Sequence, residues 1–523
     1  MNRSVPISPG RKGVAAGFLV VAIATVLFDR LFWQQGMGVN VLLFIILVVA
    51  AHLVRSDISV LSPSARWLGF GSVLAACMVV VHDSVVATIA AWSSICLFAA
   101  MAQRAALRSL VGGALEWSLN LLRVPLSAIV AVNAVLENRP MAARGWKWLR
   151  LSILPLFALV LYLSIYRAAD PRFDALTSGV VDRIAIWLHQ LFSEVLTAHA
   201  LFLLFAVVLC TALLRRMTTG SIARWEAGRS EILVRVRKRR PHWLAPGSLD
   251  PLEKERQRGI LLLAVMNGLL LVVNVIDIDW LWFDFTVPVG FDLKQFVHEG
   301  TWLLILSILL SMGILFHLFR GNLNFHPRAG MLRVLALAWV MQNFVLGVSV
   351  FLRNYHYIDF HGLAYKRIGV IVFLALVLVG LIALFRKIQM RRSMFHVLRV
   401  NAWAAYVMLL FLALFDWDSL IVRYNLQHWN QGQIDVDNYL EMSDKVIPLL
   451  YADLPKVDAQ MAKHRMNPVR WVEHLDPQGF LRDLERKRRR FIERHTEQGW
   501  PSWSWAEART FAQLQKMGLA DAK

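Results

Sequence analysis

Cysteine is scarce in this chain, and several motifs that define common classes of enzyme are missing. The three cysteines among 523 residues, Cys77, Cys96 and Cys210, all lie in apolar segments. Thiols in such positions are more often packing residues than parts of a disulfide framework or a metal site. The sequence also has no glycine-rich phosphate loop, no nucleophile motif and no His-x-x-x-His or Glu-x-x-His pattern. We therefore expect no cofactor and no metal ion.

Acidic residues are the minority charge, with 36 Asp and Glu against 56 Lys and Arg, which gives a net charge of +20. In a soluble protein this excess would suggest a nucleic-acid partner. Here 57% of the residues are hydrophobic, and the mean hydropathy is +0.51. Basic loops are the ordinary signature of the cytoplasmic side of a membrane protein. The composition therefore predicts a membrane protein whose partner is the lipid bilayer, with no nucleic acid.

Long apolar runs dominate the rest of the chain. A run of about twenty apolar residues is long enough to cross the hydrocarbon core as a helix, and a helix satisfies its own backbone polar groups in lipid. The sequence predicts an all-α, polytopic transmembrane bundle of about eleven spans within residues 1–416, followed by a small, polar helical tail at 417–523. The predicted spans are 14–32, 40–54, 67–81, 85–102, 151–166, 196–214, 260–275, 301–319, 332–352, 368–385 and 398–415.

Charge alternates across the gaps between these spans. Every second gap is basic, beginning with Arg3, Arg11 and Lys12 before the first span. The positive-inside rule then places the N-terminus in the cytoplasm, and an odd number of spans places the C-terminal tail outside. One gap, which contains Arg353 and Arg367, is basic and still falls on the outer side.

Two further segments are amphipathic, and we expect them to lie in the membrane interface. They are 117–136 on the inner side and 181–195 on the outer side. If 117–136 spanned the membrane instead, the orientation of everything after it would reverse. Arg123 near its centre makes insertion costly, by about 3 kcal/mol.

Several phrases of the sequence resemble a known family. They are Leu27–Phe32 with Gly36-Met37-Gly38, Ala169–Phe173, Phe296–Thr301, Gly362-Leu363 with Tyr365–Gly369, and Asp416-Trp417-Asp418 with Arg423-Tyr424-Asn425. Together they resemble the bacterial membrane-protein family known as domain of unknown function 4173. The resemblance implies a multi-pass protein of the bacterial inner (cytoplasmic) membrane. It implies no established activity, cofactor or catalytic residue.

Polar side chains gather at the predicted outer ends of the later spans. We expect a candidate outer-face cluster of Asp277, Asp279, His298, Glu299, Arg353, His356 and His361. Imidazole and carboxylate groups together can relay protons, but charged groups at a span end also serve as interfacial anchors. Within the spans, Asn267, Asn274, Gln342, Asn343 and Asn401 favour interhelical hydrogen bonds, with a solute path as the alternative.

A run of basic residues within 235–240 is expected to contact anionic lipid. Anionic lipid attracts such a run by about 1 kcal/mol per basic residue near the surface, although the run can also act only as a topology determinant. The residues are Arg235, Arg237, Lys238, Arg239 and Arg240.

Three functions remain open from the sequence. The first is a non-catalytic membrane protein with an assembly or regulatory role and an unidentified protein partner. The second is a transporter of a small solute. The third is an enzyme that acts at the outer face on a lipid-linked substrate.

Overall fold

The computed structural model describes residues 11–55, 61–136, 140–179, 182, 183, 186, 197–235, 251–283, 293–428, 434, 436, 438–466 and 476–521. For residues 11–18, 55, 128–136, 140–147, 149, 150, 153, 251, 293–299 and 464–466 it describes the backbone alone. The predicted interfacial segment 181–195 lies almost entirely outside the described residues, as do Arg237, Lys238, Arg239 and Arg240.

The described residues are α-helical with no β-strand, which confirms the all-α prediction. The larger group of helices consists of α1 (Arg11–Phe32), α2 (Val39–Arg55), α3 (Pro63–His82), α4 (Val85–Gln103), α5 (Leu110–Leu136), α6 (Pro140–Ala169), α8 (Ala198–Leu214), α9 (Ser221–Ala227), α10 (Pro251–Asp277), α11 (Leu293–Leu318), α12 (Gly330–His361), α13 (Tyr365–Met390) and α14 (Met394–Ala413). The tail contains α15 (Trp417–Gln427), α16 (Asn438–Glu441), α17 (Ile447–Ala452), α18 (Leu454–Met466), α19 (Pro477–Glu497) and α20 (Trp505–Lys516). Short π or 3₁₀ turns are η2 (Ile278–Trp282), η3 (Asn322–Phe325), η4 (Asp444–Val446) and η5 (Trp500–Ser502).

Each of the eleven predicted spans coincides with a helix. Seven described helices are long and apolar enough to cross a membrane, and three shorter apolar helices lie at Val39–Val54, Leu154–Ala169 and Ala198–Leu214. The remaining predicted span lies in α1. The chain is thus a membrane-spanning protein with a polytopic helical bundle.

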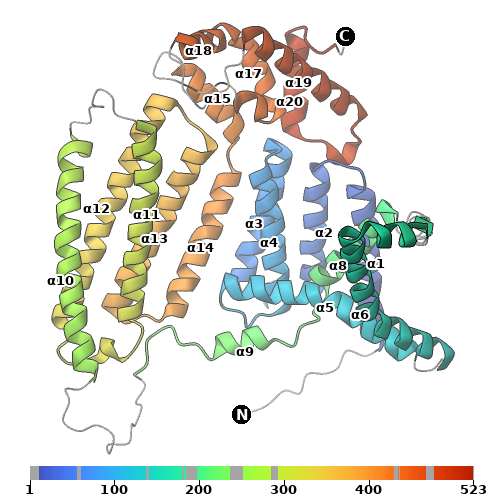
Figure 1. Cartoon of the computed structure of the whole chain (residues 1–523), viewed down its shortest axis with the longest axis horizontal. Helices are drawn as coiled ribbons and strands as arrows, with labels where there is room; N and C mark the ends of the chain where they lie inside the picture. The colour runs from blue at the N-terminus through green and yellow to red at the C-terminus, as the bar shows by residue number, and fades with distance from the viewer. Residues whose placement is uncertain are drawn as a thin grey trace, which may run out of the picture.

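The spanning helices form two groups joined through α14 (Figure 1). One group is α1–α4 with α8, and the other is α10–α13. The tail helices gather at one end of the bundle, which we call the tail-facing end. Helices α5 and α9 lie at the opposite end, which we call the basic end because Arg104, Arg108, Arg391 and Arg392 lie there.

Helix α5 runs across the basic end rather than alongside the spans (Figure 1). Its apolar stripe is exposed, with Leu115, Leu122 and Leu126 each at least half accessible, whereas Glu116 and Asn120 are buried against the bundle. An apolar face turned away from the protein fits the predicted place in the membrane interface.

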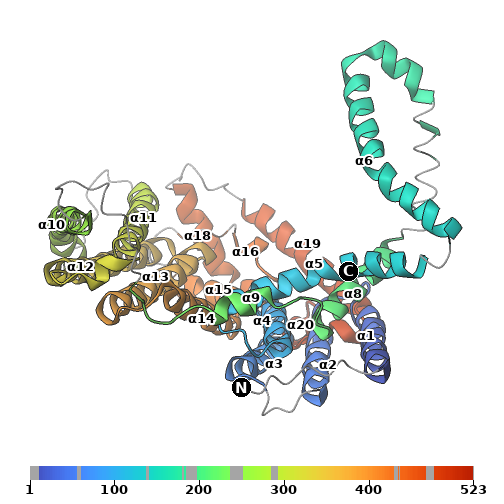
Figure 2. The same cartoon turned by 90° about the horizontal axis from the view of Figure 1, so that it is seen from below.

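Helix α6 does not run alongside the other spanning helices, as a predicted span would. It contains the predicted span 151–166, but it projects away from the bundle (Figure 2). Leu154 and Phe157 are 76% and 65% exposed. From Leu151 onward α6 is apolar on all sides, and it has few neighbours among the described residues, so no described contact fixes its direction against the other helices. Its spanning role stays a prediction.

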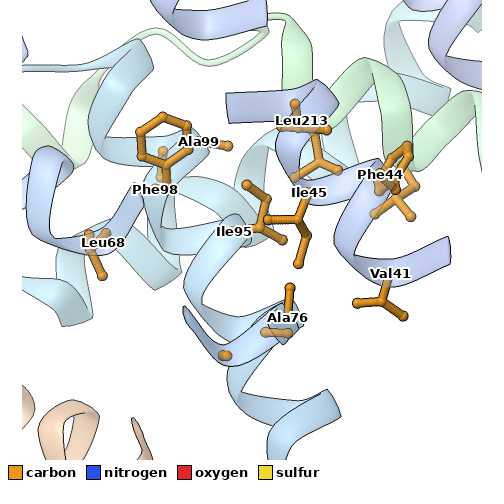
Figure 3. Packing of buried hydrophobic residues seen from close by; sticks show 14 of the residues in the cluster. Val41, Phe44, Ile45, Leu68, Ala76, Ile95, Phe98, Ala99 and Leu213 are labelled. Atoms are coloured by element: carbon orange, nitrogen blue, oxygen red, sulfur yellow. The ribbon is translucent and has the colours of Figure 1, made fainter. Parts of the chain in front are cut away.

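Small residues allow close packing in the first helix group (Figure 3). Ala75 and Ala76 of α3 and Ala90 and Ala91 of α4 are buried in the core of this group, and Ala76 is labelled in Figure 3. A Cβ at Gly69 would lie 3.1 Å from the ring of Phe98. Small residues at helix contacts are the usual means of association in lipid, where burial of apolar surface gives little driving force.

The basic end is held together by two glutamates, Glu226 and Glu231, that the sequence did not single out. Glu226 is fully buried and accepts hydrogen bonds from the backbone N–H of Arg108 (2.6 Å) and from the Ser109 hydroxyl. Glu231 pairs with Arg108, His396 and Arg399, which ties the segment after α9 to the loop before α5 and to α14. Burial raises the pKa of Glu231, but the hydrogen bond from His396 and the nearby cations outweigh it and lower that pKa.

Candidate functional site at the tail-facing end

Three loops of the bundle meet the tail at this end. The backbone N–H of Gly36 donates to Ser502 Oγ (2.8 Å), and that of Val39 donates to the carbonyl of Trp503 (3.0 Å). A Cβ at Gly38 would lie 2.4 Å from the Trp503 carbonyl oxygen. Only glycine therefore allows the α1–α2 loop to approach the tail this closely.

The loop between α12 and α13 is the second contact. Gly362 has φ of +79°, a left-handed conformation that glycine adopts readily. Asn425 of α15 accepts a hydrogen bond from the N–H of Leu363 (2.6 Å) and donates to its carbonyl (3.0 Å). One side chain thus completes the hydrogen bonding of the turn.

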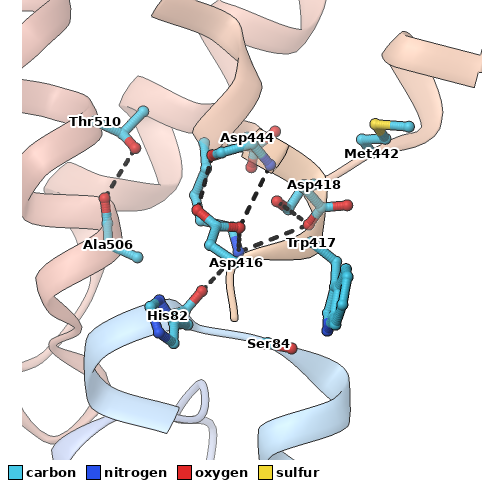
Figure 4. A network of polar contacts seen from close by, with 12 residues as sticks. His82, Ser84, Asp416, Trp417, Asp418, Met442, Asp444, Ala506 and Thr510 are labelled. Carbon is cyan, nitrogen blue, oxygen red and sulfur yellow. Dashed lines mark hydrogen bonds and ion pairs between the residues drawn. The ribbon is translucent and has the colours of Figure 1, made fainter. Parts of the chain in front are cut away.

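The third contact is centred on Lys445, whose partners His82, Asp416 and Asp418 are labelled in Figure 4. Its ammonium group donates to the carbonyl of His82 (2.6 Å) and lies 2.9 Å from Asp416 and 3.6 Å from Asp418. The Lys445 side chain is only 7% exposed. Asp418 also accepts hydrogen bonds from Tyr365 and Ser443, both at 2.5 Å. The network joins the tail to α3, α13 and the end of α14.

The electrostatics of this contact favour anionic Asp416. Burial raises its pKa, but the Lys445 charge and the hydrogen bonds from Lys445 and Ser419 outweigh burial and lower it. In the adjoining loop, burial, reinforced by the Glu507 carboxylate, raises the pKa of Asp83 to about 6. The pKa values of the two carboxyl groups therefore shift in opposite directions: Lys445 donates a hydrogen bond directly to Asp416, whereas at Asp83 the charges of Lys445 and Arg494 only partly offset burial.

A cavity of about 500 Å³ lies between the tail and the bundle. The bundle contributes His82, α15 contributes Arg423 and Tyr424, and α20 contributes Arg509 and Gln513. Lys445 neutralises Asp416 on one wall. No ion pair involves Arg423 or Arg509 among the described residues, so two exposed guanidinium groups leave the cavity positively charged.

The predicted outer-face cluster comes together only in part. Asp277 and Arg353 form a buried ion pair at 2.5 Å that joins α10 to α12. A Cβ at Gly300 would lie 3.1 Å from the Arg353 guanidinium, so α11 also packs here. Among the described atoms, Asp277 Oδ2 has no hydrogen-bond partner.

The other members lie apart from this pair or lack described side chains. Asp279 is exposed, and His356 is half-buried with its ring against Tyr355. His361 packs against Tyr357 with ring centroids 4.5 Å apart. His298 and Glu299 fall in the first turns of α11, but their side chains lie outside the described residues. No group of three His, Cys, Asp or Glu residues that could hold a metal ion is found in the described part of the chain.

His82 at the end of α3 and Asp416 after α14 both line the cavity between the tail and the bundle. Asp29 of α1 accepts a hydrogen bond from His199 of α8 at 2.7 Å, and this contact joins those two helices. The sequence did not single out Lys445 or Arg509, because each lies in a polar helical segment that resembles a solvated face. Arg423 belongs to one of the sequence phrases that resemble a known family, but its place in the cavity depends on where α20 packs.

The fold and the site together define an all-helical, membrane-spanning protein with a polar tail docked on one end of its bundle. The chain matches the model of the family described as Domain of unknown function (DUF4153) over residues 15–452, and it belongs to that family. The family suggested by the sequence phrases, domain of unknown function 4173, is not confirmed. No curated protein and no solved structure matches the chain.

Proposed function

We propose that this chain is a non-catalytic protein of the bacterial inner membrane with a regulatory role. The basic end lies in the cytoplasm, and the tail at 417–523 forms a separate module outside. This orientation is supported by the gathering of the basic loops at the end opposite the tail, as the positive-inside rule requires.

A reporter fused after Lys523 tests the orientation. Alkaline phosphatase should be active in this position and green fluorescent protein should be dark, because phosphatase folds outside the cytoplasm. A fluorescent fusion without phosphatase activity would reverse the proposed orientation.

The regulatory proposal rests on the cavity between the tail and the bundle. Guanidinium groups match the geometry of oxyanions, and Arg423 and Arg509 reach the cavity from different tail helices. The potentially reactive groups are otherwise engaged: His82 Nε2 contacts the Leu414 carbonyl (3.0 Å), and Asp416 is paired with Lys445. The arrangement favours binding of a small oxyanion over catalysis. Because bundle and tail share the walls, the bound anion stabilises the docked tail.

Anion-dependent stability of the tail tests this proposal. Inorganic phosphate or citrate at a hundredfold excess over its Kd should stabilise the docked state by about 2.7 kcal/mol. Hydrogen exchange of 502–514, measured in the full chain in detergent, reports the docking. The double variant Arg423→Gln/Arg509→Gln should lose this response.

Two comparisons make the test specific. Arg486→Gln, at an α19 arginine whose side chain is 65% exposed, should keep the full response. Chloride at the same ionic strength should give none. An equal effect of chloride, or an unchanged response in the double variant, would reject anion binding in this cavity.

The transporter and enzyme alternatives gain less from the structure. Gln342 donates to Asn267 Oδ1 (3.0 Å), and Asn274 donates to the Gln342 carbonyl (3.1 Å). These amides therefore join α10 to α12, as expected for interhelical hydrogen bonds. The Asp277–Arg353 pair is buried between α10 and α12, which leaves it poorly placed to act on a substrate.

A further inference from the structure

A second cavity, of about 480 Å³, lies between α11, α12 and α13. We call it the lateral groove. Its apolar wall includes Trp302, Ile305, Val370 and Phe373. Trp302 is 63% exposed and Phe373 is 37% exposed, so the groove reaches the outer surface of the bundle. It is separate from the cavity between α15 and α20, and nothing below rests on the function proposed for that cavity.

One end of the lateral groove is cationic. Lys366 and Arg367 lie in the first turn of α13 and line it. Arg367 is held in place because it donates to the His361 carbonyl (2.8 Å), and its guanidinium lies 4.7 Å from the centre of the Tyr357 ring. Lys366 is exposed. The N-terminus of the 26-residue helix α13 adds partial positive charge at the same place.

The groove also contains a buried hydroxyl group. Thr301 is 4% exposed and lines the groove, and its Oγ1 has no hydrogen-bond partner among the described atoms. Buried polar groups in folded proteins are almost always satisfied, so an orphaned one points to a missing partner. A ligand with an oxygen near Thr301 would supply it.

We propose that the lateral groove binds a phosphate-bearing lipid of the surrounding bilayer. The phosphate lies beside Lys366 and the start of α13, and an acyl chain follows Ile305, Val370 and Phe373. The apolar wall favours a lipid over a free phosphate compound, because a small soluble anion would leave that wall unfilled. The exposed aromatic residues Trp302 and Tyr365 suit the level of the lipid headgroups.

Lipid retention by the full chain tests this site. In native mass spectrometry from detergent, dioleoyl phosphatidylglycerol should stay bound at one per chain. Dioleoylglycerol, which has the same chains without phosphate, should bind at least tenfold more weakly, and so should glycerol 3-phosphate. Equal retention of dioleoylglycerol would show that the site does not recognise phosphate. Tight binding of glycerol 3-phosphate alone would show that the ligand is not a lipid. Either result overturns the proposal.

Two variants locate the lipid. Gly369 lines the groove, and a Cβ there meets nothing within 4 Å. Because the Cβ has open space, Gly369→Leu places an apolar side chain in the groove, and it raises helix propensity. It should lower phosphatidylglycerol retention at least tenfold without loss of stability. Lys366→Gln should lower the preference for phosphatidylglycerol over dioleoylglycerol.

A matched glycine serves as the control. Gly268 of α10 also has nothing within 4 Å of an added Cβ, and it lies away from the groove. Gly268→Leu should retain the lipid at the wild-type level. Wild-type retention in Gly369→Leu, or equal loss in both leucine variants, would place the lipid elsewhere and overturn the assignment.

Discussion

Replacing Arg353 with methionine should lower the free energy of unfolding by about 3–5 kcal/mol. The Arg353 and Asp277 side chains are only 9% and 5% exposed. The variant leaves the Asp277 carboxylate buried without its cation, and an uncompensated buried charge costs far more than the net value of the pair. Unfolding titrations in sodium dodecyl sulfate, on protein purified in mild detergent, measure the change.

The double variant Asp277→Leu/Arg353→Met separates charge from packing. It should recover most of the lost stability, because replacing both members of a buried pair with apolar residues is often close to neutral. Arg30→Met removes an exposed arginine and should change stability by less than about 0.5 kcal/mol. A loss below about 1 kcal/mol in Arg353→Met, or no recovery in the double variant, contradicts this role for the pair.

Lys445→Met should detach the tail from the bundle. The substitution leaves Asp416 and Asp418 together without their shared cation and removes the hydrogen bond to the His82 carbonyl. We expect a loss of about 3 kcal/mol in the docked state, which corresponds to about a hundredfold faster hydrogen exchange in α17 and α20. Exchange in α3 and α4 should change little.

Lys456 supplies the matched comparison for this prediction. It pairs with Asp453 at 2.7 Å, but both side chains are more than a third exposed. Lys456→Met should therefore cost less than about 1 kcal/mol. Adding Asp416→Asn to Lys445→Met should restore part of the protection, since Asp418 keeps its hydrogen bonds from Tyr365 and Ser443. Similar exchange in the two lysine variants would mean that Lys445 does not hold the tail.

Helix positions were predictable because lipid imposes a length and a composition on every crossing segment. Even the short predicted span at 67–81 lies within a full helix of 20 residues, α3. The interfacial prediction for 117–136 rests on Arg123 and the periodic leucines, which mark α5 as amphipathic, and it stays a prediction. The direction of α6 could not be predicted, since an apolar helix with few protein contacts has nothing in its sequence that fixes its angle.

The candidate site was only partly predictable, because its members come from distant parts of the chain. Asp277 and Arg353 were both singled out, but their pairing depends on how α10 packs against α12. Lys445 meets His82 across 363 positions of sequence. Neither position carries a local pattern that separates a buried partner from an ordinary solvated charge.

The sequence by itself determined that this protein is an all-α, polytopic membrane protein with a polar tail, because hydrophobic length and charge are local properties. Tertiary structure alone decided that the tail closes over three loops of the bundle, and that Arg423 and Arg509 share one cavity. It also decided that Thr301 and Lys366 share one groove. These arrangements arise from side-chain packing between distant segments, and the energy of such contacts depends on burial and geometry that no stretch of sequence specifies.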